Sequence, residues 1–260
     1  YYSRLYDIYM DYQDVEGIYA VNEAAGDHPV KVEPEVMSLL RFGIESYELT
    51  QGRVNIAMGS VLSIWHDLRE QAQTDPASAK LPEESQLRSA AQHCDLMKLQ
   101  LDDDAGTAYL EDPEMRLDVG AIAKGYIADR LKEYLKDHGI RRAIIDLGGN
   151  VLAMGNKLDG SDYNIGIQKP FDRTGEPITS VRLSNKSIVT SGTYQRYFES
   201  EGSMYHHILD PHTGYPCENN LRSVTIITNS SLTADALSTT CFLLGYDKGL
   251  RLVDQLDNVD

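Results

Sequence analysis

Four short segments of this 260-residue chain combine polar and small residues in patterns that could support chemistry. In residues 117–126, Asp118 and two glycines surround a predicted strand-to-helix junction that places Lys124 in the first helical turn. A lysine there opposes the helix dipole unless an anion binds the free N–H groups. The segment fits either an anion site or a tight turn with an exposed lysine. The phosphate and dinucleotide motifs GxxxxGK[ST] and GxGxxG are absent.

The second segment, residues 206–216, is a polar loop closed by proline and glycine. It holds three histidines and an aspartate within seven residues. Imidazole titrates near neutral pH and suits a general base, whereas the zinc-protease spacing HExxH is absent. The alternative is a polar turn whose histidine and aspartate side chains only satisfy backbone groups.

The third and fourth segments are rich in hydroxyl groups. Asp235 and Thr239 are four residues apart on a predicted helix and therefore share one face. A carboxylate and a hydroxyl are hard oxygen ligands suited to Mg²⁺, although Thr233 and Asp235 could equally serve to cap the helix. In residues 189–194 a predicted strand ends at Ser191 and Gly192, which can bind phosphate or ribose but also resemble many β-turns.

The elements that would position these segments alternate irregularly, which predicts an α+β fold with mixed or antiparallel sheets and packed helices. A chain of this length forms one large domain or two lobes. The tyrosine-rich residues 1–22 are predicted to begin helical and end in a loop. Periodicity and stop signals predict helices over 34–51, 84–94, 121–138 and 233–244, and strands over 143–147, 151–154, 163–168, 181–183, 187–189 and 223–228.

The acidic composition disfavours some classes of ligand. Twenty-four basic against 40 acidic residues give a net charge of −16, which disfavours binding to nucleic acid or to an anionic membrane surface. An anionic substrate would need a cation or backbone dipoles to offset the repulsion. Three cysteines are too few for a disulfide framework or a zinc site, and no apolar run reaches 18 residues.

In this order, the segments resemble the ApbE family of FAD:protein FMN transferases. The similar motifs are Ala-Lys-Gly-Tyr within residues 118–129, Gly-Gly-Asn at 148–150, Ser-Gly-x-Tyr at 191–194, His-x-x-Asp-Pro-x-Thr-Gly-x-Pro at 207–216 and Ala-Asp-x-x-x-Thr at 234–239. The resemblance covers residues 1–260 as a single two-lobed domain. The family's N-terminal Met-Gly-Thr strand and its C-terminal strand are absent, and Asn55 replaces a family acidic residue.

The resemblance implies particular site residues. His207 would be the catalytic base and Asp235 a second catalytic residue. Mg²⁺ would be held by Asp235, Thr239 and the carbonyl of Ala121, with Ser238 nearby. FAD would be contacted by Tyr12, Arg53, Val54, Asn55, Asp118, Lys124, Ser191, Gly192 and Leu209.

The implied activity is Mg²⁺-dependent transfer of FMN from FAD to a threonine or serine hydroxyl of an acceptor redox protein, with release of AMP. The alternatives are an FAD pyrophosphatase giving FMN and AMP, a non-catalytic FAD-binding or scavenging protein, and a domain without a ligand. The resemblance also implies export to the periplasm or the outer face of the cytoplasmic membrane. It leaves open a lipid anchor, as in a lipoprotein, on a segment outside this chain.

Overall fold

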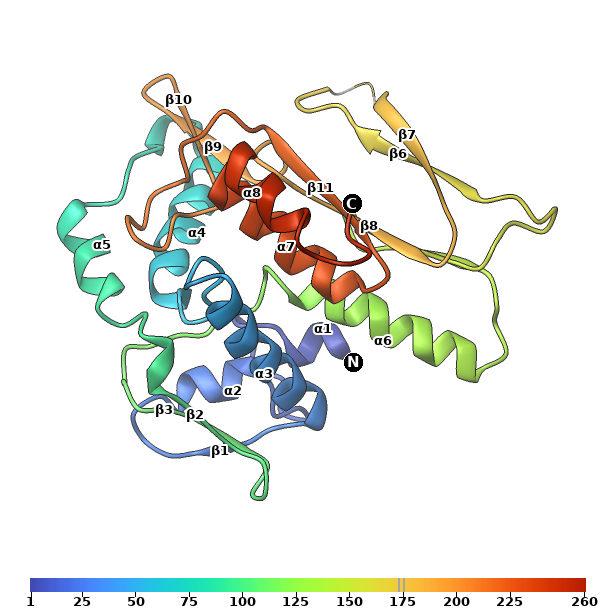
Figure 1. Cartoon of the computed structure of the whole chain (residues 1–260). Helices are drawn as coiled ribbons and strands as arrows, with labels where there is room; N and C mark the ends of the chain where they lie inside the picture. Colours follow the sequence, from blue (N-terminus) through green and yellow to red (C-terminus); the bar gives the residue numbers. More distant parts are fainter. Residues whose placement is uncertain (173, 175) are drawn as a thin grey trace. The chain divides into compact units, whose positions relative to one another are not determined.

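The computed structural model of the chain describes residues 1–172, 174 and 176–260 (Figure 1). Contacts divide it into two units. Unit 1 holds residues 1–121 and 196–217, and unit 2 holds residues 122–195 and 218–260. The four motif segments are therefore distributed over both units.

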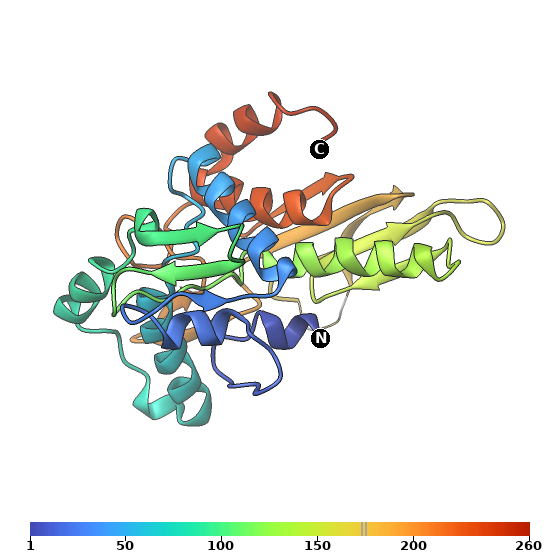
Figure 2. The same cartoon turned by 90° about the horizontal axis from the view of Figure 1, so that it is seen from below.

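Unit 1 combines helices with short antiparallel strands. Its helices are α1 (Tyr2–Leu5), α2 (Ile18–Glu23), α3 (Pro34–Leu49), α4 (Gly59–Thr74) and α5 (Glu84–Ala91), with 3-10 turns η1 (Pro76–Ser78) and η2 (Leu96–Lys98). Its strands are β1 (Val30–Lys31), β2 (Leu99–Asp102), β3 (Thr107–Leu110), β9 (Tyr197–Ser200) and β10 (Ser203–His206). The first three pair in the order β1-β3-β2, visible as blue and green arrows in Figure 2, and β9 pairs with β10.

The limits of α3 agree with the predicted helix: Pro34 occupies its first position, and a glycine follows its end.

An apolar cluster on α4 forms part of the unit 1 core. The cluster on α4 contains Trp65, joins α5 to β9, and reaches the loop after β10. Its buried members are Met58, Val61, Trp65, Ala72, Leu87, Phe198 and Leu209.

Unit 2 is built on an antiparallel sheet with helices on one face. The sheet order is β11 (Ser223–Thr228), β8 (Lys186–Gly192), β5 (Asn150–Met154) and β4 (Ala143–Asp146). Helices α6 (Ala123–Asp137), α7 (Ser231–Leu244) and α8 (Tyr246–Val253) complete the unit with the hairpin β6 (Tyr163–Gln168) and β7 (Pro177–Leu183) (Figure 1).

The alternation of side chains along β5 explains these layers. Leu152 and Met154 pack with α6, whereas Ala153 packs with the β6–β7 hairpin on the opposite face. A period of two places alternate residues on opposite faces of a strand. On the neighbouring β8, Val189 packs with α7, while Ile188 packs toward the hairpin.

The structure confirms the α+β class and the predicted helices over 34–51, 84–94, 121–138 and 233–244. Each predicted end lies within three residues of the observed one. Three expectations were wrong. Residues 117–120 were expected to end a strand, but they form no strand. Residues 18–23 form α2 instead of a loop, and the N-cap of α7 is Ser230, not Thr233. In the described part of the chain, no helix is both long and apolar enough to cross a bilayer. All three cysteines are present as thiols.

Candidate functional site

Asp235 is the buried carboxylate of unit 2 and lies in the second turn of α7. Only 3% of the residue is exposed. Its Oδ2 accepts a hydrogen bond from the backbone N–H of Gly125 on α6 at 2.8 Å. The ammonium of Lys124 lies 3.7 Å from its Oδ1. Two adjacent residues at the start of α6 therefore hold this carboxylate.

The approach of α6 to α7 depends on the glycine. A Cβ at Gly125 would lie 2.4 Å from the backbone oxygen of Ser231 and 2.6 Å from Cα of Leu232. Real Cβ atoms do not approach backbone so closely, so a larger residue would force the two helices apart. The absence of a side chain brings the N–H of residue 125 within hydrogen-bond distance of Asp235.

Asp129, one turn further along α6, caps α7. Its carboxylate accepts from the backbone N–H groups of Ser231 and Leu232 and from Oγ of Ser230, each at 3.0 Å. These are N–H groups at the start of a helix, which have no partner within the helix itself. A negative charge there also interacts favourably with the helix dipole. Asp129 thereby fixes the start of the helix that carries Asp235.

Three hydroxyl groups gather one turn after Asp235. Oγ of Ser191, near the end of β8, lies 2.7 Å from Oγ of Ser238 and 3.2 Å from Oγ1 of Thr239. Ser238 is fully buried, and its Oγ also donates to the backbone oxygen of Asp235 at 3.0 Å. The structure thus brings Ser191 of β8 against Ser238 and Thr239 of α7, the helix that holds Asp235.

The electrostatics of Asp235 favour a cation. Burial raises the pKa of its carboxyl above the ordinary value, while the Lys124 ammonium and the Gly125 N–H oppose that rise. A buried carboxylate is stable as an anion only with compensating positive charge. One carboxylate with neighbouring hydroxyl oxygens is a donor set that fits Mg²⁺. Among the described residues, no group of three or more His, Cys, Asp and Glu side chains could form a metal site of its own.

In unit 1, His207 begins the polar loop that follows β10. Its Nδ1 lies 3.1 Å from the backbone oxygen of Arg196. A carbonyl oxygen can only accept, so Nδ1 carries the proton in this contact. In the neutral ring the basic lone pair then belongs to Nε2. This tautomer is the one required if Nε2 takes a proton from a substrate.

Backbone hydrogen bonds close the loop on itself. The N–H of Asp210 donates to the oxygen of Tyr215, and the N–H of Gly214 donates to the oxygen of Asp210, both at 2.8 Å. The Asp210 carboxylate lies 3.5 Å from the guanidinium of Arg53, and both side chains are about one-quarter exposed. This ion pair connects the loop to the predicted flavin segment, residues 53–55.

The other predicted residues of that segment have structural partners. The amide of Asn55 donates to the backbone oxygen of Cys94 at 2.9 Å and accepts from the N–H of Ala57 at 2.9 Å. Val54 is buried. An aspartate at position 55 could accept from Ala57 but could not donate to Cys94. Asn55 therefore ties its segment to Cys94 in the chain that follows α5, and its flavin contact stays a prediction.

Asp118 lies at the end of an extended segment that is held on several sides. Its N–H donates to the oxygen of Ile56, and its Oδ1 accepts from the N–H of Gly120. Asn22 both donates to and accepts from the backbone of Leu117, at 3.0 and 2.7 Å. These bonds fix the backbone immediately before the carboxylate.

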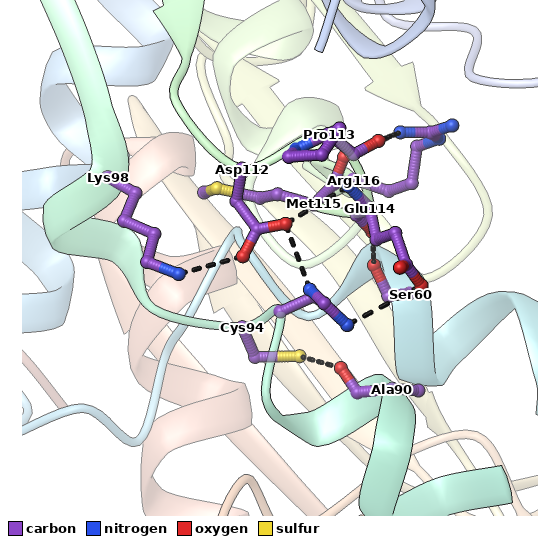
Figure 3. Close-up of polar contacts among 10 residues, drawn as sticks. Ser60, Ala90, Cys94, Lys98, Asp112, Pro113, Glu114, Met115 and Arg116 are labelled. Atoms are coloured by element: carbon purple, nitrogen blue, oxygen red, sulfur yellow. Dashed lines mark hydrogen bonds and ion pairs between the residues drawn. The ribbon is translucent and has the colours of Figure 1, made fainter. Parts of the chain in front are cut away.

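A buried ionic network supports the same segment from residues 112–116 (Figure 3). The Asp112 carboxylate lies 2.7 Å from Nζ of Lys98 and 2.9 Å from Nδ1 of His93, and it accepts from the N–H of Glu114. Ser60 donates to the oxygen of Glu114 at 2.6 Å. The sequence reasoning missed this network because its members are far apart in the chain.

The predicted site residues divide between the units. Lys124, Ser191, Gly192, Asp235, Ser238 and Thr239 belong to unit 2, and Tyr12, Arg53, Val54, Asn55, Asp118, Ala121, His207 and Leu209 belong to unit 1. Tyr12 donates to Asp7 at 3.1 Å, and Leu209 is buried. Gly125 and Asp129 were not singled out, although both belong to the motif over residues 118–129.

Comparisons with known proteins agree with the motif pattern. The ApbE family profile matches residues 2–260. An FAD:protein FMN transferase of Klebsiella pneumoniae is 35% identical over 99% of this chain and 80% of its own length. One of Treponema pallidum is 34% identical over 95% of this chain and 70% of its own length.

Solved structures share the fold. A crystal structure of the ApbE protein from Thermotoga maritima superposes with a TM-score of 0.84 at 28% identity, covering 98% of this chain and 78% of that chain. The flavin transferase ApbE from Vibrio cholerae gives a TM-score of 0.81 at 24% identity, covering 99% and 79%. The chain belongs to the ApbE family and is an enzyme of that family.

Proposed function

We propose that this enzyme transfers the FMN half of FAD to a threonine or serine hydroxyl of an acceptor protein and releases AMP, in a Mg²⁺-dependent reaction. The observation that carries the proposal is the buried Asp235 carboxylate beside Lys124 and a cluster of hydroxyl groups. It occurs in a chain whose relatives are FAD:protein FMN transferases. The acceptor would be a redox protein that uses the attached flavin.

In the proposed reaction, Nε2 of His207 removes the proton from the acceptor hydroxyl. The hydroxyl oxygen then forms a bond to the FMN-side phosphorus, and the bond from that phosphorus to the bridging oxygen breaks. The electron pair leaves with AMP. The Nδ1 contact with Arg196 supports this role because it leaves the lone pair on Nε2.

Charge stabilisation in this reaction would come from the bound ion and from the start of α6. Asp235, Thr239 and the carbonyl of Ala121 would hold Mg²⁺, with Ser238 beside it. When bound, the ion would neutralise charge on the pyrophosphate oxygens. Lys124, beside Asp235 at the first turn of α6, would add a positive charge for the same phosphates. Together, the ion and Lys124 would offset the repulsion between an anionic substrate and a chain of charge −16.

The proposed flavin contacts are those that the resemblance to the family implies. The residues expected to contact FAD are Tyr12, residues 53–55, Asp118, Ser191, Gly192 and Leu209. The Arg53–Asp210 ion pair supports a common role for residues 53–55 and the His207 loop. No covalent enzyme intermediate is needed, because positioning and charge stabilisation suffice for an activated pyrophosphate.

The test is mass spectrometry of a threonine-containing acceptor peptide incubated with the chain, FAD and Mg²⁺. We expect a mass gain of one FMN that is abolished by EDTA and restored by excess Mg²⁺. The same peptide with threonine replaced by valine is the control and should remain unmodified. Free FMN and AMP with an unmodified peptide would identify a pyrophosphatase instead, and intact FAD throughout would identify a binding protein.

A further inference from the structure

Trp65, the chain's single tryptophan, lies against the loop that carries His207. It is 5% exposed and belongs to α4 in unit 1. Its indole Nε1–H donates to the backbone oxygen of Gly214 at 2.7 Å. The bond joins residues 149 positions apart in the sequence. A buried donor or acceptor left without its partner is costly, so this bond ties the loop to α4.

The indole also contacts both chain segments that flank His207. The ring of Tyr205, two residues before His207, lies 6.0 Å from the Trp65 ring, and the ring of Tyr215 lies 5.5 Å away in an edge arrangement. Aromatic pairs at these distances stabilise packing beyond their buried area. The strand that enters the loop and the segment that leaves it therefore rest on one side chain.

Gly214 is the residue at which the loop contacts both itself and Trp65. Gly214 has φ +70°, which favours glycine. The N–H of Gly214 is used within the loop by Asp210, while its carbonyl faces the indole. The internal bonds shape the turn, and the Trp65 bond attaches it to α4.

We infer that Trp65 is a positioning residue for the proposed transfer: by holding Gly214 and packing on Tyr205 and Tyr215, it fixes the place and orientation of the His207 imidazole. The inference rests on the proposed function, in which His207 takes the acceptor proton. A base displaced by about 1 Å can slow a reaction roughly a hundredfold without altering substrate affinity.

Trp65→Phe tests the role, because it keeps an aromatic ring and removes the N–H donor. We expect kcat for FMN transfer to fall roughly tenfold or more, with the Kd for FAD changed by less than about twofold. Backbone amides of residues 208–216 should exchange with deuterium faster than in the wild type. Other amides should exchange as before. The matched control is Leu87→Val, which shortens a buried side chain of the same cluster on α5.

The control should lower the melting temperature while kcat and loop exchange stay at wild-type values. Wild-type kcat and loop exchange in Trp65→Phe would overturn the inference. So would an equal loss of kcat in Leu87→Val, because that result would trace the loss to core stability. If the wild type transfers no FMN, the proposed function fails together with the catalytic role. That outcome differs from a failure of the inference alone, because the wild type itself would then show no rate of FMN transfer.

Discussion

The backbone N–H of Gly125 and the carboxylate of Asp235 are joined by a 2.8 Å hydrogen bond between two helices in backbone contact. The position of the carboxylate therefore depends on a main-chain N–H of α6 as well as on the Lys124 ammonium, which lies 3.7 Å away. Main-chain donors are held by the helix and lose little entropy when they bind an anion. This contact gives the proposed Mg²⁺ ligand a fixed place before any substrate arrives.

Asp235→Asn should abolish Mg²⁺-dependent FMN transfer, with a loss of at least roughly a hundredfold. The amide keeps the shape and can still accept from Gly125, but it removes the negative charge that would attract the cation. The melting temperature should stay close to that of the wild type, which separates a lost charge from a lost fold. Near-normal transfer in Mg²⁺ would show that Asp235 is not a metal ligand.

Asp129→Asn should destabilise the start of α7 by roughly 2 kcal/mol, because two of three bonds to one charged carboxylate go to the first backbone N–H groups of the helix. Chemical denaturation measures the loss. The control is Asp137→Asn at the exposed end of α6, the helix that carries Asp129. It should change stability by less than about 0.5 kcal/mol. Equal losses of stability in the two variants would mean that the hydrogen bonds of Asp129 do not stabilise the start of α7.

Gly125→Ala should cost about 1–3 kcal/mol or more, because the new methyl meets the backbone of Ser231. Gly43→Ala on α3 is the matched control, since the nearest atoms to its methyl would belong to the Ile56 side chain and not to backbone. Thermal unfolding of the two variants compares the costs. A milder effect at residue 125 than at residue 43 would contradict a close backbone approach between α6 and α7.

His207→Ala should slow FMN transfer by roughly a hundredfold or more while leaving FAD affinity nearly unchanged. The reason is that the imidazole is assigned to the acceptor proton and not to flavin binding. Stopped reactions analysed by mass spectrometry give the rate, and quenching of flavin fluorescence gives the Kd. A parallel loss of affinity would assign His207 a structural role.

The Asp112 network predicts a loss of stability in acid. Burial alone would raise the pKa of Asp112, but hydrogen bonds from Lys98, Glu114 and His93 outweigh it and lower the pKa from 3.8 to about 2. Because the folded pKa is the lower one, the ionised form stabilises the fold. That contribution, at most about 2.5 kcal/mol, is complete above pH 3.8 and is lost as the pH falls through about 2.

Unfolding by urea between pH 2 and 5 measures this contribution. The wild type should lose more stability across the range than Asp112→Asn, which has no carboxylate to protonate at this position. Equal slopes in the two proteins would show that the network does not lower the pKa of Asp112.

The sequence predicted elements with a strong local signal and missed those that depend on distant partners. Helix α3 has a proline start, an apolar period and a glycine stop. Strand β1 has two residues and pairs with β3 about 75 positions later, so no local pattern announces it. The cap of α7 was placed at Thr233 because Ser230 and Thr233 look alike locally, whereas Asp129 of another helix favours the earlier start.

The site shows the same division. The common face of Asp235 and Thr239 follows from their spacing on one helix. The contact of Ser191 with Ser238 requires β8 to pack on α7, which no spacing rule supplies. Asn55 was assigned by motif position to the flavin, but its amide serves the backbone of Cys94 and Ala57. Which backbone groups lack a partner is known only once the fold is known.

Because the chain has a single tryptophan, its intrinsic tryptophan fluorescence reports on one site. All tryptophan emission comes from Trp65, whose N–H is bonded to the backbone of the His207 loop. A change in that loop on acceptor binding would alter the polarity around one fluorophore, without a label and without signal from other tryptophans. The wavelength of this emission can therefore report the polarity around the loop during a turnover.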